Sequence, residues 1–353
     1  MALARSGGRQ VHTRDVSGMQ LIAGIDLGGT AVNYTLLDLE GHFHIDGLCE
    51  HPARSVEGPD VCLQQIEDGL AIAVAQAGAT MADVIAVGLD TPGPASATGV
   101  LSAEGSTNFV HAQWAGFDLP GNLSIRLDRP VSYLNDGNAG ALWGHFNIFG
   151  RRPATSISAI VGTGLGGGVI VDGRVVTGRA GFGGELGHVL IPTQRIAGLE
   201  DATPRCNCGR IGDLESVCSL TGIRNTLLPT FLARHPGHEL AALDLRDAAK
   251  KVRGLAERGD AMCRDIFRAQ AHALGLFFDQ MINTFDPDAL IVGGGAIEAS
   301  PAFQTWFLDE IRAGMPGQRA EQADIPLRIM PNGDTAGARG AALEALRLAT
   351  VTR

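Results

Sequence analysis

The sequence predicts a protein of two related α/β domains, and three observations support this prediction. The chain has 353 residues, more than one small hydrophobic core usually serves. Strand patterns and helix patterns alternate along most of it. A strand, a glycine turn and a second strand occur early in the chain and again about 135 residues later. Either an internal duplication or chance in a chain with 48 glycines explains this second copy.

The first part of the chain opens with an antiparallel pattern. Leu21–Asp26 is a short apolar run that continues into Leu-Gly-Gly-Thr, and Val32–Leu39 alternates between apolar and polar residues. Glycine turns predict two antiparallel strands here, with a third strand after Gly41. Helical spacing over Val61–Ala77 then predicts a helix that stops at Gly78.

The next strands lead to a polar turn. Val84–Leu89 and Pro130–Leu134 have the apolar pattern of buried strands. The second of them runs into Asn-Asp-Gly-Asn, and a helix of small residues is expected from Ala139. Asp136 in this turn is placed either to accept a proton from a substrate hydroxyl or to cap the helix that follows. The residues of the turn leave both interpretations open.

The second copy of the opening pattern begins at Ile157–Val161. This strand leads into Gly-Thr-Gly-Leu-Gly-Gly-Gly, and the strands Val169–Val171 and Arg174–Val176 follow. The remaining predicted elements are a long helix, a strand and an alanine-rich helix that packs back against the first domain, at Asp260–Phe285, Ala289–Val292 and Gly337–Leu348.

Both glycine turns suit the binding of phosphate. Glycine has no Cβ, so backbone N–H groups approach a phosphate closely, and Thr30 and Thr163 add hydroxyl donors. Neither turn is a P-loop or a dinucleotide-binding turn. Asp26 ends the first strand, where its carboxylate is placed to hold Mg²⁺ through water. A third cluster, Gly293–Gly295, is either the border of a flat ligand such as adenine or an ordinary strand-to-helix turn.

One segment has the composition of a zinc site. Its ligands would be a histidine, two cysteines one residue apart and an aspartate: His188, Cys206, Cys208 and Asp213. A carboxylate is harder than a thiolate and is expected to bind Zn²⁺ less tightly, so a metal-free segment is the alternative. Glu185 and Glu215 flank the segment and are carboxylates of the kind that bind sugar hydroxyls.

Composition excludes several functions. The net charge of −10 argues against binding of nucleic acid, which requires clustered Lys and Arg. No apolar run reaches the ~18–20 residues that span a bilayer. Residues 1–18 are polar and do not resemble a secretory signal, so we expect a disordered tail. The four remaining cysteines form no disulfide framework, which is typical of a cytoplasmic protein.

Five segments in order carry a resemblance to a known family. They are Asp26-Leu-Gly-Gly-Thr, Asn135-Asp-Gly-Asn-Ala, Gly162-Thr-Gly-Leu-Gly-Gly-Gly, Glu185-Leu-Gly-His and Cys206-Asn-Cys-Gly-Arg-Ile-Gly. Together they resemble the ROK family of sugar kinases over residues 20–350. The resemblance implies an actin-like ATPase (ribonuclease H-like) fold, with two α/β domains around a central cleft. Residues 19–134 and 335–353 would form the small domain, and residues 135–334 the large one.

The resemblance also implies an activity and its residues. The chain would use ATP with Mg²⁺ to phosphorylate a hexose, with glucose expected, at the 6-hydroxyl, and Asp136 would be the general base. It would act as a cytoplasmic homodimer without nucleic-acid or membrane partners. The ATP-binding residues would be Asp26, Gly28, Gly29, Thr30, Thr163, Gly164, Gly294 and Gly295. The sugar would contact Asn108, Asp136, Glu185, His188 and Glu215. A structural Zn²⁺ would be held by His188, Cys206, Cys208 and Asp213.

The sequence departs from the family pattern at three places. Asp213 stands where a third cysteine is usual, Ala31 replaces a polar residue, and Thr107-Asn108-Phe109 replaces Pro-Asn-Leu. Two alternatives therefore stay open: a kinase for an N-acetylhexosamine, mannose or fructose, and a sugar-binding ROK protein without kinase activity. A ROK repressor would need about 60–80 further N-terminal residues for its helix-turn-helix domain, and is not expected from this acidic chain.

Overall fold

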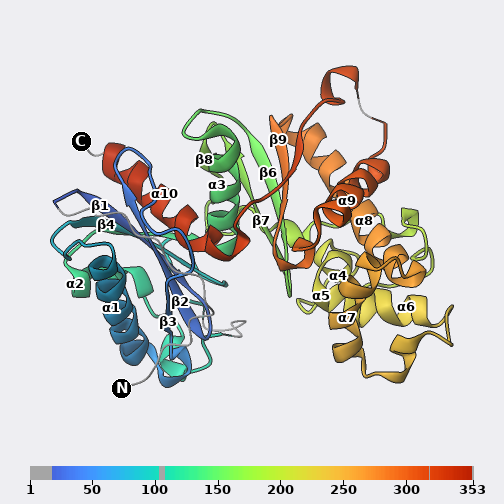
Figure 1. Ribbon diagram of the computed structural model, residues 1–353, viewed down its shortest axis with the longest axis horizontal. Coiled ribbons are helices and arrows are strands. Elements are labelled where there is room, and N and C mark those ends of the chain that lie inside the picture. Colours follow the sequence, from blue (N-terminus) through green and yellow to red (C-terminus); the bar gives the residue numbers. More distant parts are fainter. Residues whose placement is uncertain (1–17, 103–107, 318, 352–353) are drawn as a thin grey trace. The chain divides into compact units, whose positions relative to one another are not determined.

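The computed structural model describes residues 18–102, 108–317 and 319–351, which form two compact units (Figure 1). Unit 1 contains the chain up to Trp143, the segment Thr177–Gly183 and the chain from Asp334 onward. Unit 2 contains Gly144–Val176 and Gly184–Gly333. Residues 1–17 of the predicted tail and Thr107 lie outside the described residues. The predicted domain boundaries remain a prediction. The two units are defined by their compactness, and a compact unit is not shown to fold on its own.

Unit 1 is built on a five-stranded sheet with the strand order β3-β2-β1-β4-β5. Strand β1 pairs antiparallel with β2 and parallel with β4, and β5 continues the parallel part. The glycine turn between β1 and β2 is therefore a hairpin, as the sequence predicts. The strands are β1 Leu21–Leu27, β2 Ala31–Asp38, β3 Glu50–Pro52, β4 Val84–Thr91 and β5 Val131–Asn135.

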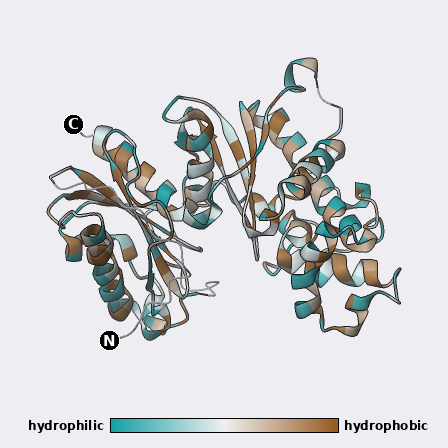
Figure 2. Cartoon of the chain, viewed as in Figure 1, coloured by the Kyte–Doolittle hydropathy of each residue, from teal (hydrophilic) through white to brown (hydrophobic). Residues whose placement is uncertain are grey.

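Two long helices, α1 and α10, pack on this sheet. Helix α1 (Pro59–Gln76) buries an apolar stripe that joins Ile25 of β1 in one core, and its other side is hydrophilic (Figure 2). Helix α10 (Ala336–Val351) packs on β1 and β4. Gly88 of β4 permits this packing, because a Cβ there would overlap the backbone of Ala341. The remaining helices of this part are α2 (Leu119–Leu127) and α3 (Asp136–Phe149), and the chain passes into unit 2 within α3.

Unit 2 repeats the sheet of unit 1. Its strand order is β10-β9-β6-β7-β8, with β6–β7 and β7–β8 antiparallel and β6–β9 and β9–β10 parallel. Each strand of one sheet thus has a counterpart in the other, and this agreement supports duplication over chance. The strands are β6 Ser156–Val161, β7 Leu165–Val171, β8 Arg174–Val175, β9 Ala289–Gly293 and β10 Leu327–Ile329.

Helix α8 (Ala261–Phe285) forms much of the core of unit 2. Asp260 caps its N-terminus, since its Oδ1 accepts a hydrogen bond from Cys263 N at 2.8 Å. The other helices are α4 Glu215–Cys218, α5 Leu220–Gly222, a π turn at Ile223–Leu227, α6 Leu228–Leu232, α7 Leu245–Glu257 and α9 Pro301–Gly314. Within the described part of the chain, no helix is both long enough and apolar enough to cross a membrane.

The structure corrects two of the predicted elements. The third strand expected after Gly41 is present as β3, which pairs antiparallel with β2, but it begins only at Glu50, and the chain next to Gly41 forms a bridge between Leu37 and Phe43. The Asp38 carboxylate explains this, because it accepts the His42 N–H at 2.8 Å and holds the turn through a side chain. Helix α3 begins at Asp136 rather than at Ala139.

Candidate functional site

The glycine turn of unit 1 lies against one of the predicted sugar-binding residues. The turn Gly28–Thr30 joins β1 to β2, and Gly28 N donates to Ala31 O at 3.0 Å. A Cβ on Gly29 would lie 2.6 Å from the Oδ1 atom of Asn108, so only glycine allows this approach. The predicted phosphate turn and Asn108 are therefore neighbours within one unit.

Three aspartates lie at the carboxyl ends of neighbouring strands in unit 1. Asp26 of β1 pairs in register with Asp90 of β4, and Asp136 follows β5 directly. Asp90 is fully buried, and its carboxyl oxygens accept no hydrogen bond from a donor in the described residues. Burial raises the pKa of Asp90 well above its ordinary value, and the charges of Asp26 and Asp136 raise it further. Burial also raises the pKa of Asp26.

Sequence reasoning did not identify Asp90 as part of this group. The sequence pattern indicated only that Asp90 ends a strand. A signal was nevertheless available, because burying a carboxylate between apolar residues and a proline turn costs free energy, and such a residue is usually kept for a function. The pairing with Asp26 depends on the register of two strands that lie far apart in the sequence.

The turn at the start of α3 shows which residue caps the helix, a question that the sequence left open for Asp136. Asn135 Oδ1 accepts a hydrogen bond from Asn138 N at 2.9 Å, which is the geometry of an N-cap. Asp136 Oδ1 accepts from the adjacent Gly137 N at 2.7 Å. Asn135 therefore caps the helix, and capping does not account for Asp136.

In unit 2 the second glycine turn opens onto a cavity of about 370 Å³. The cavity combines an apolar wall with two cations, and its lining residues are Gly162, Thr163, Leu220, Ile223, Ala249, Lys250, Arg253, Phe267 and Gly295. Arg253 donates to Gly295 O, which ties helix α7 to the third glycine cluster. Thr163 and Gly295, predicted from separate motifs, thus line one cavity. Lys250 and Arg253 were not predicted, because nothing in their helical pattern distinguishes them from solvated residues.

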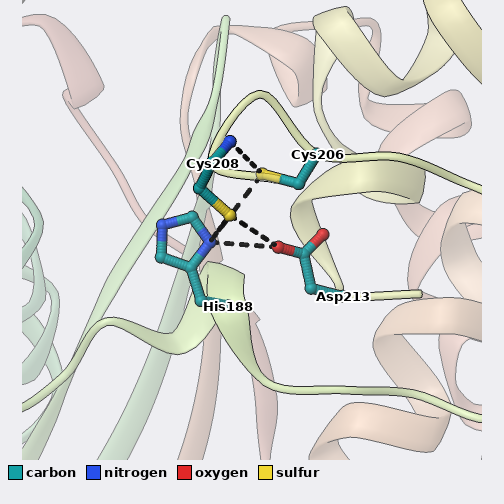
Figure 3. Close-up of side chains that lie close together, drawn as sticks. All are labelled: His188, Cys206, Cys208 and Asp213. Atoms are coloured by element: carbon teal, nitrogen blue, oxygen red, sulfur yellow. Dashed lines mark hydrogen bonds and ion pairs between the residues drawn. The ribbon is translucent and has the colours of Figure 1, made fainter. Parts of the chain in front are cut away.

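The four predicted zinc ligands lie together in unit 2 (Figure 3). His188 Nδ1 is 3.0 Å from Asp213 Oδ2 and 3.6 Å from Cys208 Sγ. Cys206 Sγ is 3.9 Å from His188 Nδ1, and Cys208 Sγ is 3.7 Å from Asp213 Oδ2. In a tetrahedral zinc site with bonds of about 2.0–2.3 Å, ligand atoms lie about 3.3–3.8 Å apart. Two of these four separations fall within that range and the other two lie within about 0.3 Å of it, so small shifts of the donor atoms would bring them to the geometry of a zinc site.

Hydrogen bonds orient two of these ligands. Asp213 is fully buried, and its second oxygen, Oδ1, accepts from Ser216 N at 3.0 Å, which leaves Oδ2 directed at the other ligands. Cys208 N lies 3.4 Å from Cys206 Sγ and donates to it. Such bonds to ligand atoms are typical of metal sites and compensate for burial of the carboxylate.

Glu215 connects this cluster to the second glycine turn. Its Oε2 atom accepts a hydrogen bond from Leu165 N at 2.9 Å, and its Oε1 atom is 3.2 Å from Cys206 Sγ. Glu185 precedes a short 3₁₀ turn, Leu186–His188, that brings the imidazole to the cluster. Of the predicted sugar-binding residues, His188 therefore belongs to the cluster, Glu215 contacts it, and Glu185 comes directly before the turn that carries His188.

The predicted site residues fall into two groups. Asp26, the turn Gly28–Thr30, Asn108 and Asp136 belong to unit 1. The second glycine turn, the cluster ligands, both glutamates and the glycines Gly294 and Gly295 belong to unit 2. A further group in unit 2, His238, Asp260 and Cys263, also brings metal-binding atoms together. Capping explains it, because His238 Nδ1 accepts from Leu240 N and Asp260 caps α8.

Comparison with known proteins identifies the family. The ROK family matches residues 22–347, which is most of the chain. This chain belongs to the ROK family. A glucokinase from Halalkalibacterium halodurans is 28% identical over 325 residues, covering 90% of this chain and 92% of that protein. An N-acetyl-D-glucosamine kinase from Escherichia coli K12 is 28% identical over 323 residues, covering 90% and 97%.

Solved structures of ROK proteins have the same fold. The ROK hexokinase from Thermus thermophilus superposes with a TM-score of 0.73 and 26% identity, covering 94% of this chain and 99% of that one. The ROK glucokinase from Streptomyces griseus, solved with glucose and AMPPNP, gives a TM-score of 0.67 and 27% identity, covering 93% and 99%. The chain therefore has the actin-like ATPase fold of ROK proteins.

Proposed function

We propose that this chain is an ATP-dependent sugar kinase that transfers the γ-phosphoryl group to the 6-hydroxyl of a hexose, with glucose as the principal acceptor. The observation that supports this proposal most strongly is that ROK relatives aligning with nine-tenths of the chain are named as kinases of sugars. In this proposal, each unit contributes groups that the reaction needs.

The donor residues come from the glycine turns and the cavity of unit 2. The adenosine of ATP occupies the cavity beside Gly295, with Gly294 behind it, and its apolar wall accepts the flat base. Backbone N–H groups of Gly28, Gly29, Thr163 and Gly164 and the hydroxyl of Thr30 bind the phosphates. Asp26 would hold Mg²⁺, and the ion would neutralise charge on the phosphates when it is bound.

The acceptor residues include the general base. Asn108, Glu185, His188 and Glu215 bind sugar hydroxyls, since carboxylates and amides orient such groups through directional hydrogen bonds. Asp136 takes the proton of the 6-hydroxyl as that oxygen forms a bond to the γ-phosphorus. The bond between this phosphorus and the β,γ-bridging oxygen breaks, and ADP leaves with the electron pair.

A structural Zn²⁺ would be held by His188, Cys206, Cys208 and Asp213. The grouping of their donor atoms supports this assignment, because all four atoms lie within 4.8 Å of one another and their separations are close to those of a tetrahedral site. Zinc supplies no step of the reaction. It fixes the segment that carries His188 and the loop that ends at Glu215, so that the acceptor groups on that segment keep their positions. A cytoplasmic homodimer remains part of the proposal by analogy with the family.

A coupled assay of ADP release over a panel of hexoses, with and without added zinc, tests the activity. We expect release that depends on sugar and is highest with glucose. The panel contains N-acetylglucosamine, N-acetylmannosamine, mannose and fructose, and a stronger response to any of these would reassign the acceptor. Sugar binding by calorimetry without any sugar-dependent ADP release would instead indicate a sugar-binding protein that lacks kinase activity.

A further inference from the structure

A buried serine lies between two segments of unit 1 that the proposed function assigns to different substrates. Ser55 begins a short 3₁₀ helix (Ser55–Glu57) after β3 and is fully buried. Its Oγ atom lies 2.7 Å from the carbonyl oxygen of Gly29, in the donor turn. The same atom lies 3.1 Å from the carbonyl oxygen of Asn108, a proposed acceptor residue. A serine hydroxyl has one hydrogen, so one donor serves both carbonyls.

The backbone around Ser55 fixes the position of this hydroxyl. Arg54 before it has φ 50°, a left-handed conformation that is uncommon for a residue with a long side chain. Trp114, which is buried, donates its Nε1–H to the carbonyl oxygen of Ser55 at 2.8 Å. Ala53 N donates to Thr30 O at 2.9 Å and ties the preceding residues to the donor turn. The hydroxyl is thus held from both sides.

Removal of this donor would leave two partly buried carbonyl oxygens close together. Each carries a partial negative charge, and neither would keep the hydrogen that now lies between them. We expect the segment with Asn108 to shift, because a partly buried acceptor without a donor is costly. Gly29 would be affected as well, since the Asn108 side chain packs directly on it.

We propose that Ser55 is a positioning residue that holds Asn108 against the Gly28–Thr30 turn and thereby aligns the acceptor sugar with the donor phosphates. The inference rests on the proposed kinase function. Ser55 is too deeply buried to reach a substrate, so it acts through Asn108.

Kinetic measurements on Ser55→Ala, Asn108→Ala and the double variant test this inference. We expect the sugar KM of Ser55→Ala to rise about tenfold and kcat to fall, because one buried hydrogen bond orients the acceptor residue. The KM for ATP should change less than threefold. In the Asn108→Ala background, the substitution of Ser55 should add little, because both changes act on one contact.

Ser124→Ala is the matched control. Its Oγ donates to the carbonyl oxygen of Arg129 at 2.6 Å in the same unit, so the control removes the same kind of bond away from the turn. We expect its sugar KM to stay within twofold of the wild type. If Ser55→Ala does not fold, Ser55→Cys takes its place, since a thiol keeps a weak donor in similar space and should raise the sugar KM less.

The possible results separate this inference from the proposed function. Wild-type protein without sugar-dependent turnover contradicts the kinase, and calorimetric sugar affinity then carries the same comparison of variants. A turnover-competent wild type with an unchanged sugar KM in the Ser55 variant overturns the inference alone. Effects of Ser55→Ala and Asn108→Ala that simply add would also overturn it, because they would show that Ser55 does not act through Asn108.

Discussion

At the scale of single residues, the proposed function assigns the role of general base to Asp136. It follows β5 directly, and Asn135 rather than Asp136 provides the helix cap. Asp136→Asn keeps the shape of the side chain and an oxygen that accepts from Gly137 N, but it removes the basic carboxylate. We expect kcat to fall by about 10²–10⁴, the usual contribution of a general base, with sugar affinity within a few-fold of the wild type.

The control for this substitution is Asp128→Asn in the same unit. The Asp128 side chain is exposed, and its φ of 52° is a conformation that asparagine tolerates. Steady-state turnover and calorimetric sugar affinity are measured for both variants. Near-normal kcat in Asp136→Asn would remove Asp136 from the role of base.

Asp90 gives a prediction about pH. Because burial raises its pKa, the folded protein binds more protons than the unfolded chain at any pH between the unfolded pKa, about 3.9, and the folded pKa. The free energy of unfolding therefore falls as pH rises through this range, by up to about 1.4 kcal/mol per pH unit for one group. Asp90→Asn does not titrate, so its stability should fall less steeply.

Urea denaturation of nucleotide-free protein at several pH values from 5 to 8 measures this slope. A residual slope from Asp26 is expected in the variant, because the pKa of Asp26 is raised too. Parallel curves for the wild type and Asp90→Asn would show that Asp90 does not titrate differently in the two states. Asp128→Asn should reproduce the wild-type curve.

At the scale of elements, we expect the segment from His188 to Glu215 to depend on the proposed zinc. The segment contains almost no regular secondary structure, and four groups with metal-binding atoms lie together in it. We expect purified protein to contain about one zinc per chain, and a chelator to lower the melting temperature. Asp213→Cys should retain zinc against the chelator at least tenfold better, because a thiolate is a softer ligand, whereas Asp213→Ala should lose it.

Elemental analysis and thermal melts with chelator measure these effects. Cys218→Ala is the control: this thiol is buried next to Gln270, away from the cluster, and its removal should leave the zinc content unchanged. Purified protein that contains clearly less than one zinc per chain would contradict the assignment of a zinc site. The kinase proposal does not depend on this result, because zinc takes no part in the phosphoryl transfer.

The elements also show what the sequence predicts well. The hairpin at Gly28–Thr30 and the strand that enters Gly293–Gly295 follow from local patterns of apolar residues and glycine, and both are present. The grouping of the four candidate metal ligands could be predicted because cysteine and histidine spacing is itself a local signal. The bridge at Leu37 could not be predicted, because the Asp38 side chain holds the turn there in place of the hydrogen bonds between two strands.

At the scale of the whole molecule, the features that the sequence did not reveal depend on contacts between distant segments. Asp90 lies beside Asp26 because β4 pairs in register with β1. Ser55 donates to two carbonyl oxygens that lie 26 and 53 residues away in the sequence. Lys250 and Arg253 become part of a cavity only when α7 packs near the second glycine turn and Gly295. Periodicity and spacing describe single elements, so these residues could not be distinguished before the fold was known.

The same dependence on distant contacts applies to α10, which comes last in the sequence yet belongs to unit 1. Arg339 on this helix is 8% exposed. Its guanidinium carbon lies 4.7 Å from the ring centre of Trp143 and 5.0 Å from that of Phe43, and Nη2 donates to Ile45 O at 3.3 Å. One side chain thus joins α10, α3 and the segment after β2.

We expect Arg339→Ala to lower the free energy of unfolding by about 2–3 kcal/mol, because a desolvated cation–π contact contributes about 2 kcal/mol and the stem also loses its packing. Hydrogen exchange should show reduced protection in β1, β4 and α10, while β6 and β9 keep theirs. The matched control is Arg347→Ala on the same helix. Its half-buried pair with Glu344 should contribute less than about 1 kcal/mol. Equal losses in both variants, or reduced protection in both sheets, would contradict a role of Arg339 confined to unit 1.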